Sequence, residues 1–165
     1  MALLVLLYSI EQRSPAPEQA ATTGGQANIG ADVAKLQERL RQNPADVDAM
    51  ISLGNTYYDA QIYTDAIPWY QKALEKQPTN TDVRTDLGTA YFYSGQNDKA
   101  KEEWAKVFQQ DPNKVQAHMN LGILYSNETP PNLDGAAKEW QTVIQLAPGT
   151  PNASQAQKLL QQIGR

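Results

Sequence analysis

One short pattern occurs three times in the sequence at a fixed interval. The segments LGNTYY, LGTAYF and LGILYS begin at Leu53, Leu87 and Leu121, so each interval is 34 residues long. An internal repeat of this length is typical of solenoids, in which one unit cannot bury its apolar face alone and therefore stacks on its neighbours. The repeat restricts the possible folds more strongly than any other feature of the chain.

Several other residue types recur in register with the Leu-Gly pair. Each pair is followed by a tyrosine, a small residue, an aromatic residue and a proline: Tyr57, Tyr91 and Tyr125; Ala66, Ala100 and Ala136; Tyr70, Trp104 and Trp140; Pro78, Pro112 and Pro148. Residues four apart share one helix face, and a proline disfavours helix in the residue before it. Each unit, the first of which follows Pro44, is therefore predicted to be a pair of antiparallel helices.

The recurring glycine suggests how these helices pack. A glycine such as Gly54 inside a helix costs up to about 1 kcal/mol relative to alanine. Its recurrence predicts a packing role, in which the backbone of a neighbouring helix approaches closely. Tyr70 and its equivalents are expected to fill the gap between successive helix pairs.

The combined pattern resembles the tetratricopeptide repeat (TPR) family over residues 45–148. The resemblance implies an all-α fold, a right-handed α-solenoid of three helix pairs. The implied repeats are residues 45–78, 79–112 and 113–148. The third repeat has two extra residues, and its segment SNETPPNLDG predicts a longer turn in which Pro130 and Pro131 prevent helix.

The chain departs from the family pattern at one position near the start of each first helix. The family has an aromatic residue there, whereas this sequence has Met50, Arg84 and His118. His118 is the only histidine, and at a packing position we expect it to be a partly buried structural residue.

Two further helices are predicted to flank the repeats. The segment ADVAKLQERLRQN, from Ala31 to Asn43, indicates the second half of an incomplete repeat. The C-terminal segment has Pro151 at a favourable first-turn position, and its polar outer face suits a capping helix at about residues 151–163. The predicted TPR domain therefore covers residues 31–165.

The first 30 residues have a different composition. We interpret residues 1–10, which contain the run ALLVLLYSI, as an apolar anchor or the end of a membrane helix, because the run is too short to span a bilayer by itself. A fraying apolar terminus is the alternative. Residues 11–30 are rich in proline and glycine and predict a flexible linker. The expected localisation is membrane-anchored on the periplasmic or another extracytoplasmic face, and the alternative is cytoplasmic.

The composition also argues against several functions. The chain has no cysteine, one histidine and a formal net charge of −4. These features disfavour thiol chemistry, a histidine metal site and the basic footprint of a nucleic-acid-binding protein. The stretch TGGQANIG lacks the ending of a phosphate-binding loop. We therefore predict that the protein is not an enzyme and has no cofactor, metal or catalytic residue.

The resemblance to TPR proteins implies a binding groove on the concave face of the solenoid, lined by the first helix of each pair. The groove residues implied in this sequence are Ile51, Asn55, Tyr58, Asp59, Thr85, Thr89, Phe92, Tyr93, Met119, Ile123 and Asn127. Of the family's carboxylate-binding residues only Asn55 is matched, because the basic positions hold Ile51, Gln116 and Asn120. The aromatic and amide side chains suit a helix or an extended apolar segment. Alternatively, Phe92 and Tyr93 merely pack between repeats.

The sequence thus predicts a membrane-tethered TPR module that binds or scaffolds a partner protein without catalysis. Its layout resembles the tethered TPR proteins of bacterial envelope assembly, including those of cytochrome c maturation. One alternative is a structural accessory subunit, permanently bound in a larger membrane complex through its convex face and N-terminal tail. Another is a cytoplasmic adaptor.

Overall fold

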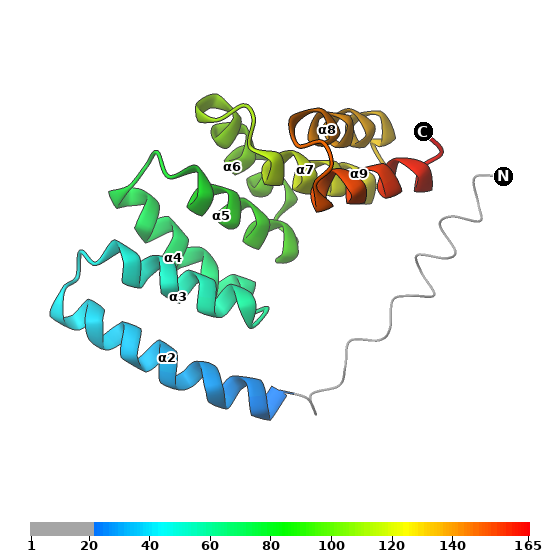
Figure 1. Ribbon diagram of the computed structural model, residues 1–165. Helices are drawn as coiled ribbons and strands as arrows, with labels where there is room; N and C mark the ends of the chain where they lie inside the picture. Colours follow the sequence, from blue (N-terminus) through cyan, green and yellow to red (C-terminus); the bar gives the residue numbers. More distant parts are fainter. Residues whose placement is uncertain (1–21) are drawn as a thin grey trace.

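The computed structural model describes residues 22–165, and side chains from residue 29 onward. Over this part of the chain the secondary structure consists of helices without strands. The helices are α2 (Thr22–Gln42), α3 (Val47–Asp59), α4 (Tyr63–Lys76), α5 (Thr81–Tyr93), α6 (Asn97–Gln110), α7 (Val115–Asn127), α8 (Leu133–Leu146) and α9 (Pro151–Gln162). They are stacked in chain order, from α2 at one end to α9 at the other (Figure 1).

Three helix pairs form the body of the molecule, as the repeat predicts. The pairs are α3 with α4, α5 with α6, and α7 with α8, with α2 leading and α9 following. The predicted all-α solenoid is confirmed. The longer turn in the third repeat is also present, since α7 ends at Asn127 and α8 begins at Leu133.

Short polar side chains fix where the first helices of two pairs begin. The Asp46 carboxylate accepts a hydrogen bond from the Ala49 backbone N–H at 2.9 Å. In the same way, the Asn80 side chain accepts from the Val83 N–H at 3.1 Å. Such N-caps satisfy backbone donors that the helix itself leaves without partners. The proline that ends one repeat and the cap two residues later therefore set the boundary between repeats.

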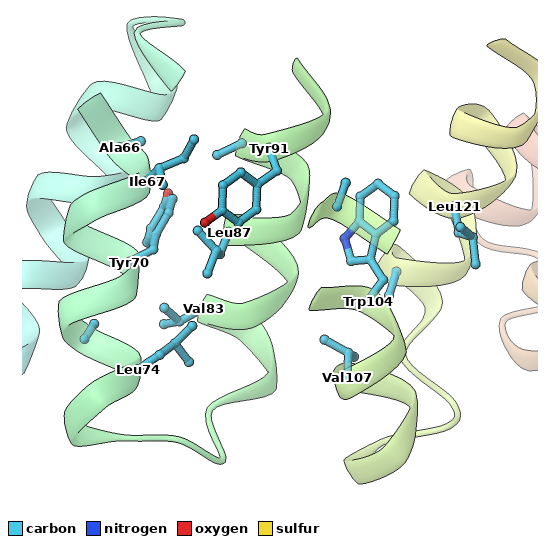
Figure 2. Packing of buried hydrophobic residues seen from close by; sticks show 14 of the residues in the cluster. Ala66, Ile67, Tyr70, Leu74, Val83, Leu87, Tyr91, Trp104, Val107 and Leu121 are labelled. Carbon is cyan, nitrogen blue, oxygen red and sulfur yellow. The ribbon is translucent and has the colours of Figure 1, made fainter. Parts of the chain in front are cut away.

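The recurring spacing of glycine and aromatic residue reflects packing within each pair. A Cβ atom at Gly54 would lie 2.5 Å from Tyr70 Cε1, and one at Gly88 would lie 2.5 Å from Trp104 Nε1. The sequence-based prediction of close backbone approach is therefore wrong in detail: the glycine makes room for the aromatic ring of its own pair. The rings also reach the next pair, because Tyr70 belongs to the same buried cluster as Leu87 (Figure 2).

The position that departs from the family pattern is linked to a second position on the following helix. In the second repeat Arg84 pairs with Glu103 at 2.7 Å, with both side chains 12% exposed. In the first repeat the equivalent residues are Met50 and Trp69, and both contribute to one hydrophobic cluster. The two repeats therefore fill the same place with an ion pair in one case and an apolar pair in the other.

In the third repeat this position is held by His118, which faces a carboxylate as Arg84 does. Its Nδ1 lies 2.6 Å from a Glu139 oxygen, and its Nε2 lies 2.9 Å from the Pro112 carbonyl oxygen. Burial opposes the charged form, but the Glu139 and Pro112 hydrogen bonds outweigh it and raise the pKa of His118. Because both partners accept, both ring nitrogens donate, as in an imidazolium. The ring also stacks on Phe108 with centroids 4.3 Å apart. His118 is thus a structural residue, as predicted.

The N-terminal part differs from the prediction. Helix α2 begins at Thr22, so residues 22–30 of the predicted linker are helical. Each residue added to an existing helix contributes a further hydrogen bond, which favours extension even through glycines.

The predicted membrane-anchored localisation is wrong on this structure. Among residues 22–165, no helix combines the length and the apolar character needed to cross a bilayer. The apolar run of residues 1–10, on which the prediction rested, lies outside the described residues.

Candidate partner-binding face

The exposed surface of α3, α5 and α7 is the candidate binding surface, and we call it the concave face. On α3 the predicted residues lie at different depths. Asn55 and Asp59 are exposed, whereas Ile51 and Tyr58 are partly buried against the main hydrophobic cluster. Asn55 also has a structural role, because its side-chain oxygen accepts a hydrogen bond from the Tyr70 hydroxyl at 2.9 Å.

Four aromatic residues form one connected group, which we call the tyrosine cluster: Tyr58, Tyr63, Phe92 and Tyr93. The Tyr63 ring stacks on the Tyr93 ring with centroids 4.9 Å apart and an interplanar angle of 23°. Tyr58 meets Tyr63 edge-on at 5.3 Å, and Phe92 lies 5.2 Å from Tyr93. Tyr93 remains 55% exposed, whereas the other three rings are partly buried, so the solvent-facing part of the cluster is centred on Tyr93.

Sequence reasoning missed Tyr63, because it lies on the second helix of its pair. A tight turn after α3 places Tyr63, the first residue of α4, beside the C-terminal end of α3. Gln61 has a φ of 61°, and its N–H donates to the Tyr58 carbonyl at 2.8 Å. The N–H of Ile62 donates to the Tyr57 carbonyl at 2.9 Å. Helix α4 can therefore begin with Tyr63 beside Tyr58.

Thr85, Thr89 and Met119 do not line an open surface. Thr89 is 6% exposed and donates to the Thr85 carbonyl at 2.8 Å, and it also accepts from the Asn120 side chain at 2.8 Å. This buried polar bridge joins α5 to α7. Met119 is 5% exposed. These predicted groove residues therefore contribute to packing.

The α7 residues also belong to a different part of the core. Ile123 packs with Met119 in a second hydrophobic cluster, separate from the one that contains Ile51, Tyr58 and Phe92. Asn127 is exposed at the end of α7. Of the predicted set, the structure brings Tyr58, Phe92 and Tyr93 together.

Asp86 is a second residue that sequence reasoning missed. It lies on α5 and is partly buried. Burial, together with the nearby charges of Asp82 and Asp59, raises its pKa to about 6, although Lys114 acts in the opposite direction. Within residues 22–165, its carboxylate receives no hydrogen bond and forms no salt bridge, because Lys114 pairs with Asp82 instead.

Replacing Asp86 with asparagine is expected to stabilise the free protein. The carboxyl of an unfolded chain titrates near about 4, so the folded state binds this proton more tightly. Ionisation of Asp86 therefore destabilises the fold as the pH rises from about 4 through about 6. Asp86→Asn should raise the free energy of unfolding by about 1 to 2 kcal/mol above this range and by little below it. Urea unfolding at the two pH extremes measures the difference.

A matched control is Glu102→Gln, which removes one charge from an exposed position on α6. It should leave the free energy of unfolding within about 0.5 kcal/mol of the wild type at both pH values. Equal stability of Asp86→Asn and wild type at high pH would contradict the account of Asp86.

A depression lies between α2 and α4, on the side of the second helices. It is open, has a volume of about 580 Å³ and is lined by Gln37, Leu40, Arg41 and Trp69. The Lys72 ammonium lies 4.3 Å from the centre of the Trp69 ring, so part of this ring is already covered.

Stacked helix pairs with exposed side chains along the first helices define a class of helical-repeat proteins that act through their surfaces. Two tetratricopeptide repeat profiles match the chain, over residues 33–81 and 59–119. The chain belongs to the tetratricopeptide repeat family. This family has a protein-interaction fold, and the chain is accordingly a protein–protein interaction module in that general sense. The comparison with curated proteins gave no match.

Several solved structures share the fold. A crystal structure of MamA is 21% identical, with 90% of this chain and 86% of that chain covered and a TM-score of 0.72. The TPR domain of Arabidopsis OM64 is 20% identical, with 71% and 95% covered and a TM-score of 0.63. The first TPR of Spaghetti (RPAP3), bound to the HSP90 peptide SRMEEVD, is 22% identical, with 72% and 94% covered and a TM-score of 0.62. At these identities the likeness concerns the fold alone.

Proposed function

We propose that the protein binds or scaffolds a partner protein. A segment of that partner docks on the concave face at the tyrosine cluster. The observation that carries this proposal is the exposure of Tyr93, which is 55% exposed although its ring stacks on Tyr63. Clustered tyrosines bury a large area at a small loss of side-chain entropy, and such residues dominate the energetics of interfaces. The predictions that the chain is not an enzyme and has no cofactor or metal remain predictions.

The side chains of this face differ from a carboxylate-binding groove. The RPAP3 domain is described as bound to the acidic peptide SRMEEVD. In this chain the positions where that kind of pocket would need basic residues are occupied by Ile51, Gln116 and Asn120. Asn120 is 7% exposed, and its amide is already engaged with Thr89 and Gln116. We therefore propose that the partner segment is recognised by aromatic contacts and not by its terminal carboxylate.

Replacing Tyr93 with alanine is expected to weaken partner binding by about 2 kcal/mol, or roughly thirtyfold, because an exposed ring at the centre of an interface is removed. The fold should be retained, since more than half of the Tyr93 surface is already in contact with solvent. Quantitative co-purification of the partner with wild type and variant measures the loss. Circular dichroism confirms the fold of each variant.

The control variant is Trp69→Ala, which removes an aromatic ring at the depression between α2 and α4. If the concave face is the binding site, this change should leave partner binding within about threefold of the wild type. The opposite outcome, binding lost in Trp69→Ala and retained in Tyr93→Ala, would favour the alternative in which the protein is an accessory subunit held through its convex face. The Leu40 and Trp69 side chains at the depression are the observation that supports this alternative.

A further inference from the structure

The charges of the first helices are distributed unevenly between their two sides. Helices α3 and α5 carry four carboxylates, those of Asp48, Asp59, Asp82 and Asp86. Their single cation, Arg84, is directed at Glu103 of α6. On α7 the only charged side chain is His118, which is directed at Glu139 of α8. Arg84 and His118 thus contact the second helices, whereas the four carboxylates remain on the first helices, where Lys114 pairs with Asp82.

Among these four carboxylates, Asp86 is partly buried and lacks a hydrogen-bond donor among the described residues. The neighbouring Lys114 pairs with Asp82 instead. A partly desolvated carboxylate without a donor is unfavourable. A cation that arrived beside it would gain a charge-assisted hydrogen bond in a site of reduced dielectric.

The tyrosine cluster adds a second source of attraction for a cation. Burial raises the pKa of the Tyr58 hydroxyl, and the charges of Tyr93, Tyr63 and Asp86 raise it further. Asp86 and Tyr93 are seven residues apart on α5 and therefore lie on one face of that helix. Aromatic faces attract ammonium and guanidinium groups. The alkyl stems of lysine and arginine also pack well on apolar rings while the charged end stays at a polar group.

We propose that the segment bound by the concave face is basic, and that one of its lysine or arginine side chains pairs with Asp86 while the stem packs on the tyrosine cluster. This inference rests on the proposed function and adds the chemical class of the partner. Like charges that face each other across an interface cost affinity and slow association. An acidic segment is therefore rejected by the same carboxylates that attract a basic one.

The test is a selection from a random library of short displayed peptides, carried out on the wild-type chain. Enriched peptides are then synthesised, and their affinities are measured by fluorescence anisotropy. Peptides with at least one lysine or arginine should dominate the enriched set. Replacing that residue with glutamine, or Asp86 with asparagine, should each weaken binding at least about tenfold, and the two changes together should be little worse than either alone.

The matched control is Glu102→Gln on α6, which removes one negative charge, as Asp86→Asn does, without touching the concave face. It should change the affinity by less than about twofold, because an exposed distant charge is screened. A general attraction between a basic peptide and an acidic protein would instead weaken equally in Asp86→Asn and Glu102→Gln, and that result would overturn the proposal.

The remaining outcomes separate this inference from the proposed function. Enriched peptides that lack basic residues but lose affinity in Tyr93→Ala would overturn the basic partner and leave the concave binding face intact. A selection without enrichment, or with binding insensitive to Tyr93→Ala, would contradict both. Self-association of the full chain that Tyr93→Ala abolishes would assign the face to a second copy and likewise overturn the basic segment.

Discussion

Replacing Gly88 with leucine is expected to lower the free energy of unfolding by about 3 kcal/mol or more. A Cβ atom at this position would lie 2.5 Å from the indole nitrogen of Trp104, which is fully buried. The ring has no room to move, because its N–H donates to the Thr85 carbonyl at 3.2 Å and its neighbours are core residues. Overpacking of this kind typically costs about 1 to 3 kcal/mol, and a branched side chain enlarges the clash. Urea unfolding followed by circular dichroism measures the loss.

Gly30→Leu provides the matched control. Gly30 is also helical, but nothing lies within 4 Å of a Cβ built there. Leucine has the higher helix propensity, so this variant should be unchanged or slightly more stable, by up to about 0.8 kcal/mol. A Gly88→Leu variant that unfolds at the same urea concentration as Gly30→Leu would refute the close contact between glycine and ring.

Removing the Glu103 carboxylate should also lower the free energy of unfolding by a large amount. Glu103→Ala leaves Arg84 charged and 12% exposed without its carboxylate, and only the Pro78 carbonyl remains as an acceptor for its Nη2. Deleting one member of a buried ion pair typically costs about 3 to 5 kcal/mol. Because this pair keeps some contact with solvent, we expect a loss of about 2 to 3 kcal/mol.

The first repeat supplies a design that should recover this loss. Its equivalent positions hold Met50 and Trp69, which pack in the hydrophobic cluster. The double variant Arg84→Met with Glu103→Trp should therefore be more stable than Glu103→Ala by at least about 1 kcal/mol, since apolar replacement of a buried ion pair is often neutral. Urea unfolding of the wild type, the single variant and the double variant decides the matter. A double variant as unstable as Glu103→Ala would show that the two repeats do not share this packing position.

The sequence by itself determined the architecture of the protein, because the information for it is local and periodic. The Leu-Gly pair, the aromatic residue and the closing proline recur at fixed distances, and each recurrence specifies one helix pair. Helices of similar length with one apolar face have few ways to stack, so the period alone predicts the solenoid. The recurring prolines mark the boundaries between the repeats for the same reason.

The tertiary structure decided which side chains reach the surface and which meet inside the core. Thr89 and Phe92 lie three residues apart on one helix, yet only Thr89 is buried in a bridge to Asn120. Tyr63 joined the binding face through a turn whose geometry depends on Gln61 at positive φ. Burial and charge pairing arise where segments distant in sequence come together, and no local period encodes those contacts. The high pKa of Asp86 and the pairing of Arg84 with Glu103 therefore became visible only in the folded chain.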